Sequence, residues 1–382
     1  MRILHLIDSL SGAGGAEQGL VREVSRFGAD NEQLVVLLYD RTDLASELEA
    51  HGIGVEVIGM AEGSGSRSWP KALMPVWRLA RSYRPDVIQS SLFLGNIVGQ
   101  LVGRILKTPV VSNLVLSGDL ESLRAFQPGA DSRNAQLLRS IAGWAARSHL
   151  VSFRALTEEV KQSNATLLGV DPGRVSVIPR GVPRQDLSNP ALRAELGLPE
   201  GPLVVNVGRL APQKGQIYLI EAFARVQEAI PTAHLVIVGK EGAAEDEVLG
   251  AIDRHGLSGS VTITGYSTRV SDYLAHAHVF AFPSVMEGLG TAVIEAMACG
   301  VPVVAFDIPP VREATVGGEY GTLVPVGDVE TLAAALTRHL ETERTVDVKA
   351  RDWVRSHHDL NRIASLVESL LRASAGVKEE RG

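Results

Sequence analysis

The sequence is poor in cysteine, in aromatic residues and in long hydrophobic runs. Cys299 is its single cysteine, which excludes an internal disulfide and any metal cluster held by several thiolates. No run of about 18 uninterrupted apolar residues occurs, and the opening MRILHLIDSL has only a short apolar run before Asp8. We therefore expect neither a membrane-spanning helix nor a secretory signal, and we place the chain in the cytoplasm.

An excess of positive charge is also missing. The chain has 37 Lys and Arg residues against 44 Asp and Glu residues, for a formal net charge of −7. An acidic chain lacks the basic footprint that binds nucleic-acid phosphates, so we exclude nucleic acid as a partner. The 382 residues, 45% of them hydrophobic, are too many for one ordinary core and fit two domains.

Short β-branched runs alternate with longer helical patterns, which is typical of parallel sheets built from βαβ units. The first half of the chain predicts strands over Ile3–Ile7, Leu34–Tyr39, Val55–Ile58, Val87–Ser90, Val110–Asn113, Leu150–Phe153 and Val175–Pro179. The second half predicts strands over Leu203–Val207, Leu235–Val238, Val261–Thr264, Val279–Phe282, Val301–Phe306 and Gly321–Val324. Helical patterns in the first half cover Ala16–Phe27, Lys71–Tyr83, Leu94–Leu106 and Ala135–Ala146.

The fold class that follows is α/β, with two Rossmann-like domains facing a central cleft. Five prolines from Pro179 to Pro202 mark a linker between them. We place the first domain at residues 1–182, the linker at residues 183–199 and the second domain at residues 200–348. A last amphipathic helix, over residues 353–373, has no strand after it, and we expect it to pack back on the first domain.

The stretch from Pro283 to Ala305 carries the strongest functional signal. Its order predicts a strand, a loop with Gly288 and Gly290, and a helix over Thr291–Ala298, whose free amides and dipole suit a phosphate group. Glu287 and Glu295 lie eight positions apart, so both carboxylates can line one cleft and accept hydrogen bonds from hydroxyls. The alternative is that Glu295 is an ordinary solvated residue and that the glycines only form a turn.

A second signal follows the strand Leu203–Val207. Gly208 and Arg209 stand at the carboxyl end of this strand, and Lys214 opens the next helix. Ligands of open α/β sheets bind outside the carboxyl ends of the strands, so both cations can neutralise a diphosphate without a metal ion. The alternative is an exposed Arg and Lys in a turn.

The first loop of the chain admits a rival interpretation. Gly12-x-Gly14 after a first strand imitates a dinucleotide-binding fingerprint, but its third glycine is replaced by Glu17. We therefore interpret the segment as a glycine-rich loop at the edge of the cleft between the domains, with the amides of Gly14 and Gly15 facing that cleft.

Together these stretches resemble the family-4 retaining glycosyltransferases of GT-B fold. The resemblance rests on Gly208-Arg-Leu-Ala-Pro-Gln-Lys-Gly and on Glu287-x7-Glu295 followed by Ala-Met-Ala-Cys-Gly-Val-Pro-Val-Val, and it covers nearly the whole chain. It implies transfer of a sugar from a nucleotide-diphosphate sugar, UDP being preferred to GDP, to an acceptor bound by the first domain. It also implies that no metal ion or other cofactor is needed.

The same resemblance assigns roles to individual residues. Arg209 and Lys214, with Glu287, would form the catalytic set, the two cations holding the donor diphosphate while Glu287 contacts hydroxyls of the sugar. Glu295 would bind the ribose. The remaining donor contacts that the resemblance implies are Gly208, Gly239, Tyr266, Gly288, Leu289, Gly290, Thr291 and Ala292.

The sequence departs from the family at its acceptor side. Where many members carry a histidine, this chain has Gln89 and Ser90 after one strand and Asn113 after the next. Either the departing phosphate takes the acceptor proton, or the acceptor site is unusual or inactive. A catalytically silent, sugar-nucleotide-binding partner subunit and a GT-B-like epimerase therefore stay open as alternatives. His5 is interpreted as a core histidine.

One segment has a charge opposite to that of the whole chain. From Gly63 to Gly118, seven basic residues face the single acid Asp86, with Trp69 and Trp77 between them. Such a segment suits an acidic acceptor or a peripheral contact with the cytoplasmic face of a membrane. The alternative is an arginine-rich solvated helix face. Neither the acceptor nor the oligomeric state follows from the sequence.

Overall fold

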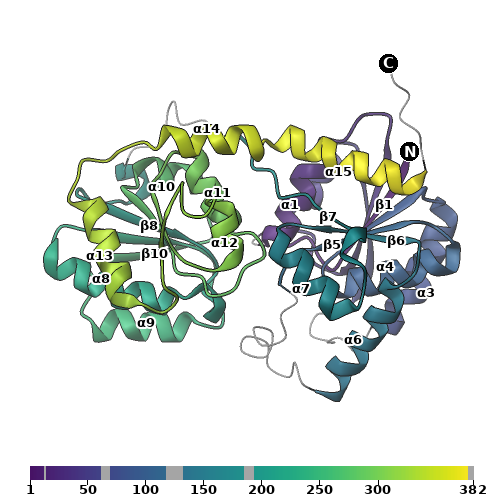
Figure 1. Ribbon diagram of the computed structural model, residues 1–382, viewed down its shortest axis with the longest axis horizontal. Helices are drawn as coiled ribbons and strands as arrows, with labels where there is room; N and C mark the ends of the chain where they lie inside the picture. The colour runs from purple at the N-terminus through teal and green to yellow at the C-terminus, as the bar shows by residue number, and fades with distance from the viewer. Residues whose placement is uncertain (13, 62–68, 118–131, 185–192, 377–382) are drawn as a thin grey trace. The chain divides into compact units, whose positions relative to one another are not determined.

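The computed structural model describes residues 1–12, 14–61, 69–117, 132–184 and 193–376 (Figure 1). Two compact units divide them, a first unit of Met1–Gly181 with Leu360–Gly382 and a second unit of Val182–Asp359. The first boundary lies one residue before the predicted end of the first domain. Residues 183–184 and 193–199 of the predicted linker belong to the second unit, and residues 185–192 lie outside the described residues.

The first unit contains a parallel seven-stranded sheet in the order β3-β2-β1-β4-β5-β6-β7. The strands alternate buried Val, Ile and Leu side chains toward both faces, as expected of a parallel sheet covered on both sides. Their bounds are Arg2–Ile7 (β1), Glu32–Tyr39 (β2), Gly54–Met60 (β3), Val87–Ser91 (β4), Val110–Leu114 (β5), Val151–Ala155 (β6) and Val175–Val177 (β7).

Helices cover both faces of this sheet. Residues of α1 (Gly15–Val24), α2 (Ala45–Ala50) and α15 (Leu360–Ala375) bury apolar side chains on one face. The other face is covered by α3 (Trp69–Tyr83), α4 (Phe93–Leu106), α6 (Arg133–Ala146) and α7 (Glu158–Leu168). None of the helices in the described ranges combines the length and apolar character that a bilayer crossing needs.

The second unit contains a parallel six-stranded sheet in the order β10-β9-β8-β11-β12-β13. The strands are β8 (Leu203–Val207), β9 (His234–Val238), β10 (Val261–Gly265), β11 (Val279–Phe282), β12 (Val303–Phe306) and β13 (Thr322–Val324). The helices are α8 (Gln216–Ala229), α9 (Glu245–Arg254), α10 (Val270–His276), α11 (Thr291–Ala298), α12 (Pro309–Ala314), α13 (Val329–Leu340) and α14 (Val348–His357). The main core of the unit joins one sheet face to α8, α9 and α13.

Each sheet has one point where its strand order reverses. In the second unit the chain proceeds outward from β8 through β9 and β10, then returns to place β11 on the other side of β8. In the first unit the same reversal separates β1 from β4. Loops at such a point diverge to opposite faces and leave room for a ligand at the carboxyl ends of the strands.

The predicted single helix over residues 353–373 is wrong. Two helices replace it, because His358 leaves the helical ladder and its carbonyl accepts a hydrogen bond from the Val182 amide (2.9 Å). The first helix, α14, belongs to the second unit, whereas α15 belongs to the first unit, as expected for the packing helix. The break therefore coincides with the return of the chain from one unit to the other.

Candidate functional site

The two strongest sequence signals meet at the reversal point of the second sheet. Gly208 and Arg209 follow β8, and the loop from Pro283 to Gly290 follows β11, which pairs in parallel with β8. Strands β8 and β11 and helix α11 have the predicted bounds. Both predicted loops therefore stand where open α/β sheets bind their ligands.

The loop after β8 lies against the loop after β9. The Gly208 amide donates to the Val238 carbonyl (3.0 Å), and the Leu210 amide donates to the Lys240 carbonyl (2.9 Å). A Cβ atom at Gly239 would overlap the carbonyl oxygen of Gly208, so this close approach requires glycine. Gly239 also forms an isolated bridge with Gly265, which places it beside the start of the Tyr266 loop.

Gly215 fixes the position of Lys214. It caps α8 in the left-handed conformation (φ +63°), and a Cβ atom there would overlap the carbonyl oxygen of Pro283. The Val285 amide donates to the Gln213 carbonyl (2.9 Å), which is a second tie between the same two loops. The turn that carries Lys214 is thus held against the loop that carries Glu287.

Replacing Gly215 by alanine should therefore harm both stability and activity. We expect Gly215→Ala to lower the free energy of unfolding by about 2–4 kcal/mol, from left-handed strain plus the clash with Pro283. Gly250→Ala, inside α9 where no atom lies within 4 Å of the new Cβ, should instead stabilise by about 0.5–1 kcal/mol. Urea unfolding of both variants checks the contrast, and equal midpoints would contradict it.

Lys214 and Glu287 form the central pair of the site. The Lys214 ammonium donates to Glu287 Oε1 at 2.6 Å, and 10% of the Glu287 side chain is exposed against 26% for Lys214. The same ammonium lies 5.9 Å from the centroid of the Phe282 ring. The two side chains, predicted to contact different parts of a ligand, thus also bind each other.

The loop after β11 ends at the start of α11. Gly290 caps this helix with φ +77°, a conformation that favours glycine, and residues 286–290 are buried. Thr291 and Ala292 hold the first two helical positions, where backbone amides have no acceptor within the helix. Glu295 is partly exposed on the same helix. The helix start therefore has the local geometry that the sequence predicted, and its role as an anion site stays a prediction.

The remaining predicted donor residues differ in exposure. Arg209 is exposed at the end of β8, and about half of the Tyr266 side chain is exposed after β10. Gly288 and Leu289 are buried in the loop before α11. Burial raises the pKa of the Cys299 thiol to about 12, with a smaller contribution from the Glu295 charge, so this thiol is not reactive.

Two polar side chains that sequence reasoning missed hold this site together. Asn206 donates from Nδ2 to the Ala281 carbonyl (2.9 Å), which joins β8 to β11, and Gln216 donates from Nε2 to the Arg209 carbonyl (3.0 Å). Asn206 Oδ1 and Gln216 Oε1 are buried without a hydrogen-bond partner among the described residues. A polar Asn within the apolar strand Leu203–Val207 was the available signal.

Three residues of the first unit that were predicted for the acceptor side lie among other buried polar side chains. They are Gln89, Ser90 and Asn113. Gln89 Oε1 forms a hydrogen bond with His5 Nδ1 (2.7 Å). The Ser90 hydroxyl donates to Asn96 Oδ1 (2.8 Å). Asn113 Nδ2 donates to Ser91 Oγ (2.8 Å). Gln89 Nε2 and Asn113 Oδ1 have no partner within the described part of the chain.

His5 is a core histidine, as predicted. Burial lowers its pKa to about 4, because the charged form is desolvated, and the hydrogen bonds to the side-chain oxygens of Gln89 and Gln33 offset this only in part. The ring is therefore neutral near pH 7. Asp8 directly follows the same strand; its carboxylate accepts from the Gly95 amide (2.7 Å), and its pKa is raised to about 6, mainly by burial.

The glycine-rich loop leads directly into α1. Gly14 caps this helix and Gly15 is its first residue, and the Gly15 carbonyl accepts a hydrogen bond from Arg180. Glu17, which replaces the third glycine of the dinucleotide fingerprint, is buried. The orientation of this loop toward a cleft stays a prediction.

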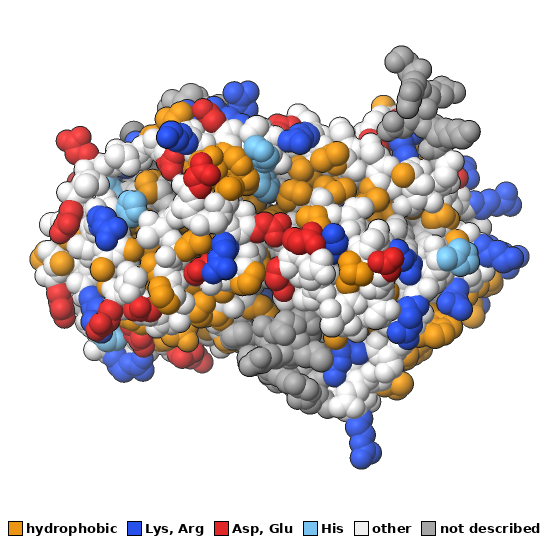
Figure 2. Space-filling view, viewed as in Figure 1, with side chains coloured by type: hydrophobic (Ala, Val, Ile, Leu, Met, Phe, Trp, Pro, Cys, Tyr) orange, Lys and Arg blue, Asp and Glu red, His pale blue; other side chains and the backbone are white. Residues whose placement is uncertain are grey.

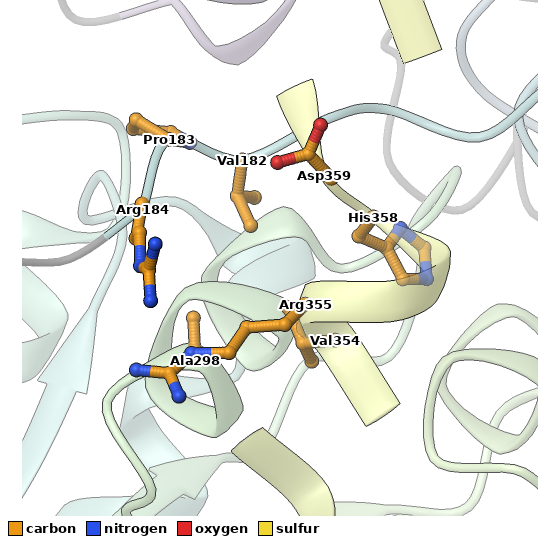
Figure 3. A pocket seen from close by; sticks show the side chains of 8 residues that line it. All are labelled: Val182, Pro183, Arg184, Ala298, Val354, Arg355, His358 and Asp359. Atoms are coloured by element: carbon orange, nitrogen blue, oxygen red, sulfur yellow. The ribbon is translucent and has the colours of Figure 1, made fainter. Parts of the chain in front are cut away.

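A cavity of about 190 Å³ opens where the chain enters and leaves the second unit (Figure 3). Its lining residues are Val182, Pro183, Arg184, Ala298, Val354, Arg355, His358 and Asp359. None of them is a predicted donor residue. In the ranges described, no group of three or more His, Cys, Asp or Glu residues is placed to hold a metal ion.

Comparison with known proteins agrees with the fold. Residues 12–181 match the model of a glycosyl transferase 4-like domain, and residues 188–355 match that of glycosyl transferases group 1. The class of protein that these observations define is a nucleotide-sugar-dependent glycosyltransferase of GT-B fold. The chain belongs to the family-4 glycosyltransferases.

Among its relatives are two named bacterial enzymes. It is 26% identical to UDP-Gal:alpha-D-GlcNAc-diphosphoundecaprenol alpha-1,3-galactosyltransferase of Escherichia coli, over 70% of each chain. It is 27% identical to 2-deoxystreptamine glucosyltransferase of Streptomyces kanamyceticus, over 77% of this chain and 79% of that one. A crystal structure of HepE from Anabaena in complex with UDP has a TM-score of 0.80 at 25% identity, covering 98% of this chain and all of that chain.

Proposed function

We propose that the chain is a retaining glycosyltransferase that binds a UDP-sugar in its second unit and needs no metal ion. The observation that carries this proposal is the Lys214–Glu287 pair beside the start of α11, at the reversal point of the sheet. A lysine, an arginine and free helix amides supply the positive potential that a diphosphate needs. The similarity to HepE, which was crystallised with UDP, supports the choice of nucleotide.

The proposed roles follow from this arrangement. Lys214 exchanges its contact with Glu287 for the donor diphosphate, and Arg209 binds the same group from the end of β8. Glu287, released from the ammonium, accepts hydrogen bonds from hydroxyls of the sugar. Glu295 accepts from the ribose hydroxyls, while Gly239 and Tyr266 border the nucleobase.

The proposed transfer retains the configuration at the anomeric carbon. The bond from that carbon to the phosphate oxygen breaks while a bond to the acceptor oxygen forms on the same face. The departing phosphate oxygen takes the acceptor proton, so UDP leaves protonated and no side-chain base is required. The two cations stabilise the negative charge that develops on the leaving diphosphate.

The acceptor presents a hydroxyl group to the first unit in this proposal. Asn113 Oδ1 and Gln89 Nε2 are buried polar atoms with no partner among the residues described, so each retains capacity for a hydrogen bond. Gly14, Gly15 and Ser90 complete the acceptor side. We also propose that the chain works in the cytoplasm, in peripheral contact with the membrane.

Labelled UDP- and GDP-sugars test the reaction type. Transfer to an added acceptor, or slow hydrolysis to free sugar and UDP, agrees with the proposal. Interconversion of the donor sugar would instead identify an epimerase. Tight donor binding without any turnover would identify a silent partner subunit.

Glu295→Gln tests the proposed ribose contact. A neutral amide is a weaker acceptor than a carboxylate, so we expect the dissociation constant for UDP to rise about tenfold, with the melting temperature unchanged. Calorimetric titration measures it, with Glu247→Gln as the matched control on the exposed face of α9. Indistinguishable titration curves for Glu295→Gln and the parent would reject the contact.

A further inference from the structure

Three neighbouring helices of the first unit contain no acidic residue. Helices α3, α4 and α6 lie next to one another on one side of the sheet (Figure 1) and hold no Asp or Glu, in a chain with 44 such residues. They contain six basic residues, and three more follow their last turns. The nine are Lys71, Arg78, Arg81, Arg84, Arg104, Lys107, Arg133, Arg139 and Arg147.

The basic residues of this side reach solvent. All nine are exposed except Arg139, which is partly buried. Figure 2 shows Lys and Arg side chains gathered over the α3 and α6 side of the first unit. We call the exposed surface of α3, α4 and α6 the basic face. Arg67 of the predicted basic segment lies outside the described residues.

Large apolar side chains are exposed on the same face. Leu137 and Trp144 of α6 are 60% and 49% exposed, and Met74 of α3 and Ile105 of α4 are also exposed. Each of the three helices already packs other apolar residues against the sheet, such as Val76, Val98 and Ala146. The exposed side chains are therefore additional to the core.

Aromatic and basic side chains of α6 and α4 lie close together on the basic face. Arg133, Leu137, Trp144 and Arg147 recur at the spacing of a single helix face, and all four are exposed. The Arg104 guanidinium of α4 lies 4.2 Å from the centroid of the Trp144 ring. The predicted aromatics Trp69 and Trp77 are instead partly buried against the core, so Trp144 is the exposed tryptophan of the basic face.

We propose that the basic face docks on the surface of an anionic lipid bilayer. This inference names the surface for the membrane contact proposed above and rests on that proposal. Basic residues at the level of anionic head groups strengthen binding by about fivefold each, and Trp and Leu side chains enter the boundary between head groups and acyl chains. An acidic protein or a nucleic acid would satisfy the charges but would leave Leu137, Trp144 and Ile105 in water.

Vesicle sedimentation with the full chain tests the proposal. The probes are vesicles of phosphatidylcholine alone and vesicles with 30% phosphatidylglycerol, at low and high salt. We expect sedimentation with the anionic vesicles only, weakened by salt. Arg78→Glu combined with Arg133→Glu should reduce the vesicle-bound fraction more than tenfold.

The matched control makes the same charge change elsewhere. Arg254→Glu with Lys349→Glu reverses two exposed basic residues of the second unit and should leave vesicle binding unchanged. Tryptophan emission should shift to shorter wavelength on anionic vesicles, and Trp144→Phe should remove this shift while most of the binding remains. Both outcomes would support the basic face as the surface that docks on the bilayer.

Several results would overturn the inference. The first two are equal binding to neutral and anionic vesicles, and no sedimentation with either. A third is an equal loss of vesicle binding in the control variant Arg254→Glu with Lys349→Glu. The fourth is binding of an oligonucleotide through Arg78 and Arg133 with no affinity for vesicles. UDP titration of the same variants should match the parent. Failure of the docking surface is therefore distinguishable from failure of the proposed donor site.

Discussion

Lys214→Ala is expected to reduce sugar transfer by about a thousandfold. The substitution removes one of two cations proposed to hold the diphosphate, a loss of the size found for other preorganised charge-stabilising groups. It also leaves Glu287, 10% exposed, without the ammonium that now lies 2.6 Å from it. Steady-state transfer or donor hydrolysis measures the loss.

The control for Lys214→Ala is Arg225→Ala, which breaks a far more exposed ion pair of the same unit. Arg225 and Glu330 form a pair at 3.0 Å whose side chains are 53% and 78% exposed. Arg225→Ala should leave both activity and stability within experimental error, because exposed pairs contribute little. Activity retained in Lys214→Ala, or lost equally in Arg225→Ala, would contradict the assignment.

Arg154→Met is expected to cause a large loss of stability in the first unit. Arg154 donates to both carboxylate oxygens of Glu23, at 2.6 and 2.8 Å, and also to the carbonyls of Ile178 and Pro179. Both side chains of the pair are nearly fully buried. Removing the guanidinium leaves a buried carboxylate and two carbonyls without this partner, at a cost of about 3 kcal/mol or more.

The matching double variant separates the ion pair from its packing. Glu23→Leu with Arg154→Met replaces both charges by apolar groups, so it should recover part of the stability lost in Arg154→Met alone. Thermal unfolding followed by circular dichroism measures the difference. If the double variant loses, relative to the parent, the sum of the stabilities lost in Glu23→Leu alone and in Arg154→Met alone, the two charges act independently.

Most of the fold could be predicted because the strands are strongly patterned. β8 and β11 begin and end at the predicted residues, and other strands differ by a few residues at their ends. The break between α14 and α15 could not be predicted, since it depends on the Val182 amide, which is distant in sequence. An amphipathic pattern that continues through His358 carries no sign of this partner.

The candidate site was only partly visible in the sequence for a similar reason. Loop glycines such as Gly215 and Gly290 are local features, and their left-handed conformations follow from the turns they make. The pairing of Lys214 with Glu287 joins loops 73 residues apart. Spacing along one strand or helix does not report such a contact, nor the hydrogen bonds of Asn206 and Gln216 that hold these loops.

The burial of Trp69 and Trp77 has the same origin. Their interleaving with arginines suggested an exposed aromatic and basic surface, but both rings pack against the core of the first unit. The exposed tryptophan of this side is Trp144, which lies outside the segment that its charge had singled out. Linear charge patterns identify a side of the molecule, whereas tertiary packing decides which side chains reach its surface.

Calorimetric titration of UDP in the presence of excess EDTA is the direct test of a diphosphate site that needs no metal ion. We expect the parent to bind UDP with the same affinity in EDTA as in magnesium, and Lys214→Ala to bind it at least tenfold more weakly in both. Loss of UDP binding in EDTA, or unchanged binding by Lys214→Ala, would contradict a diphosphate site built from side-chain cations and helix amides alone.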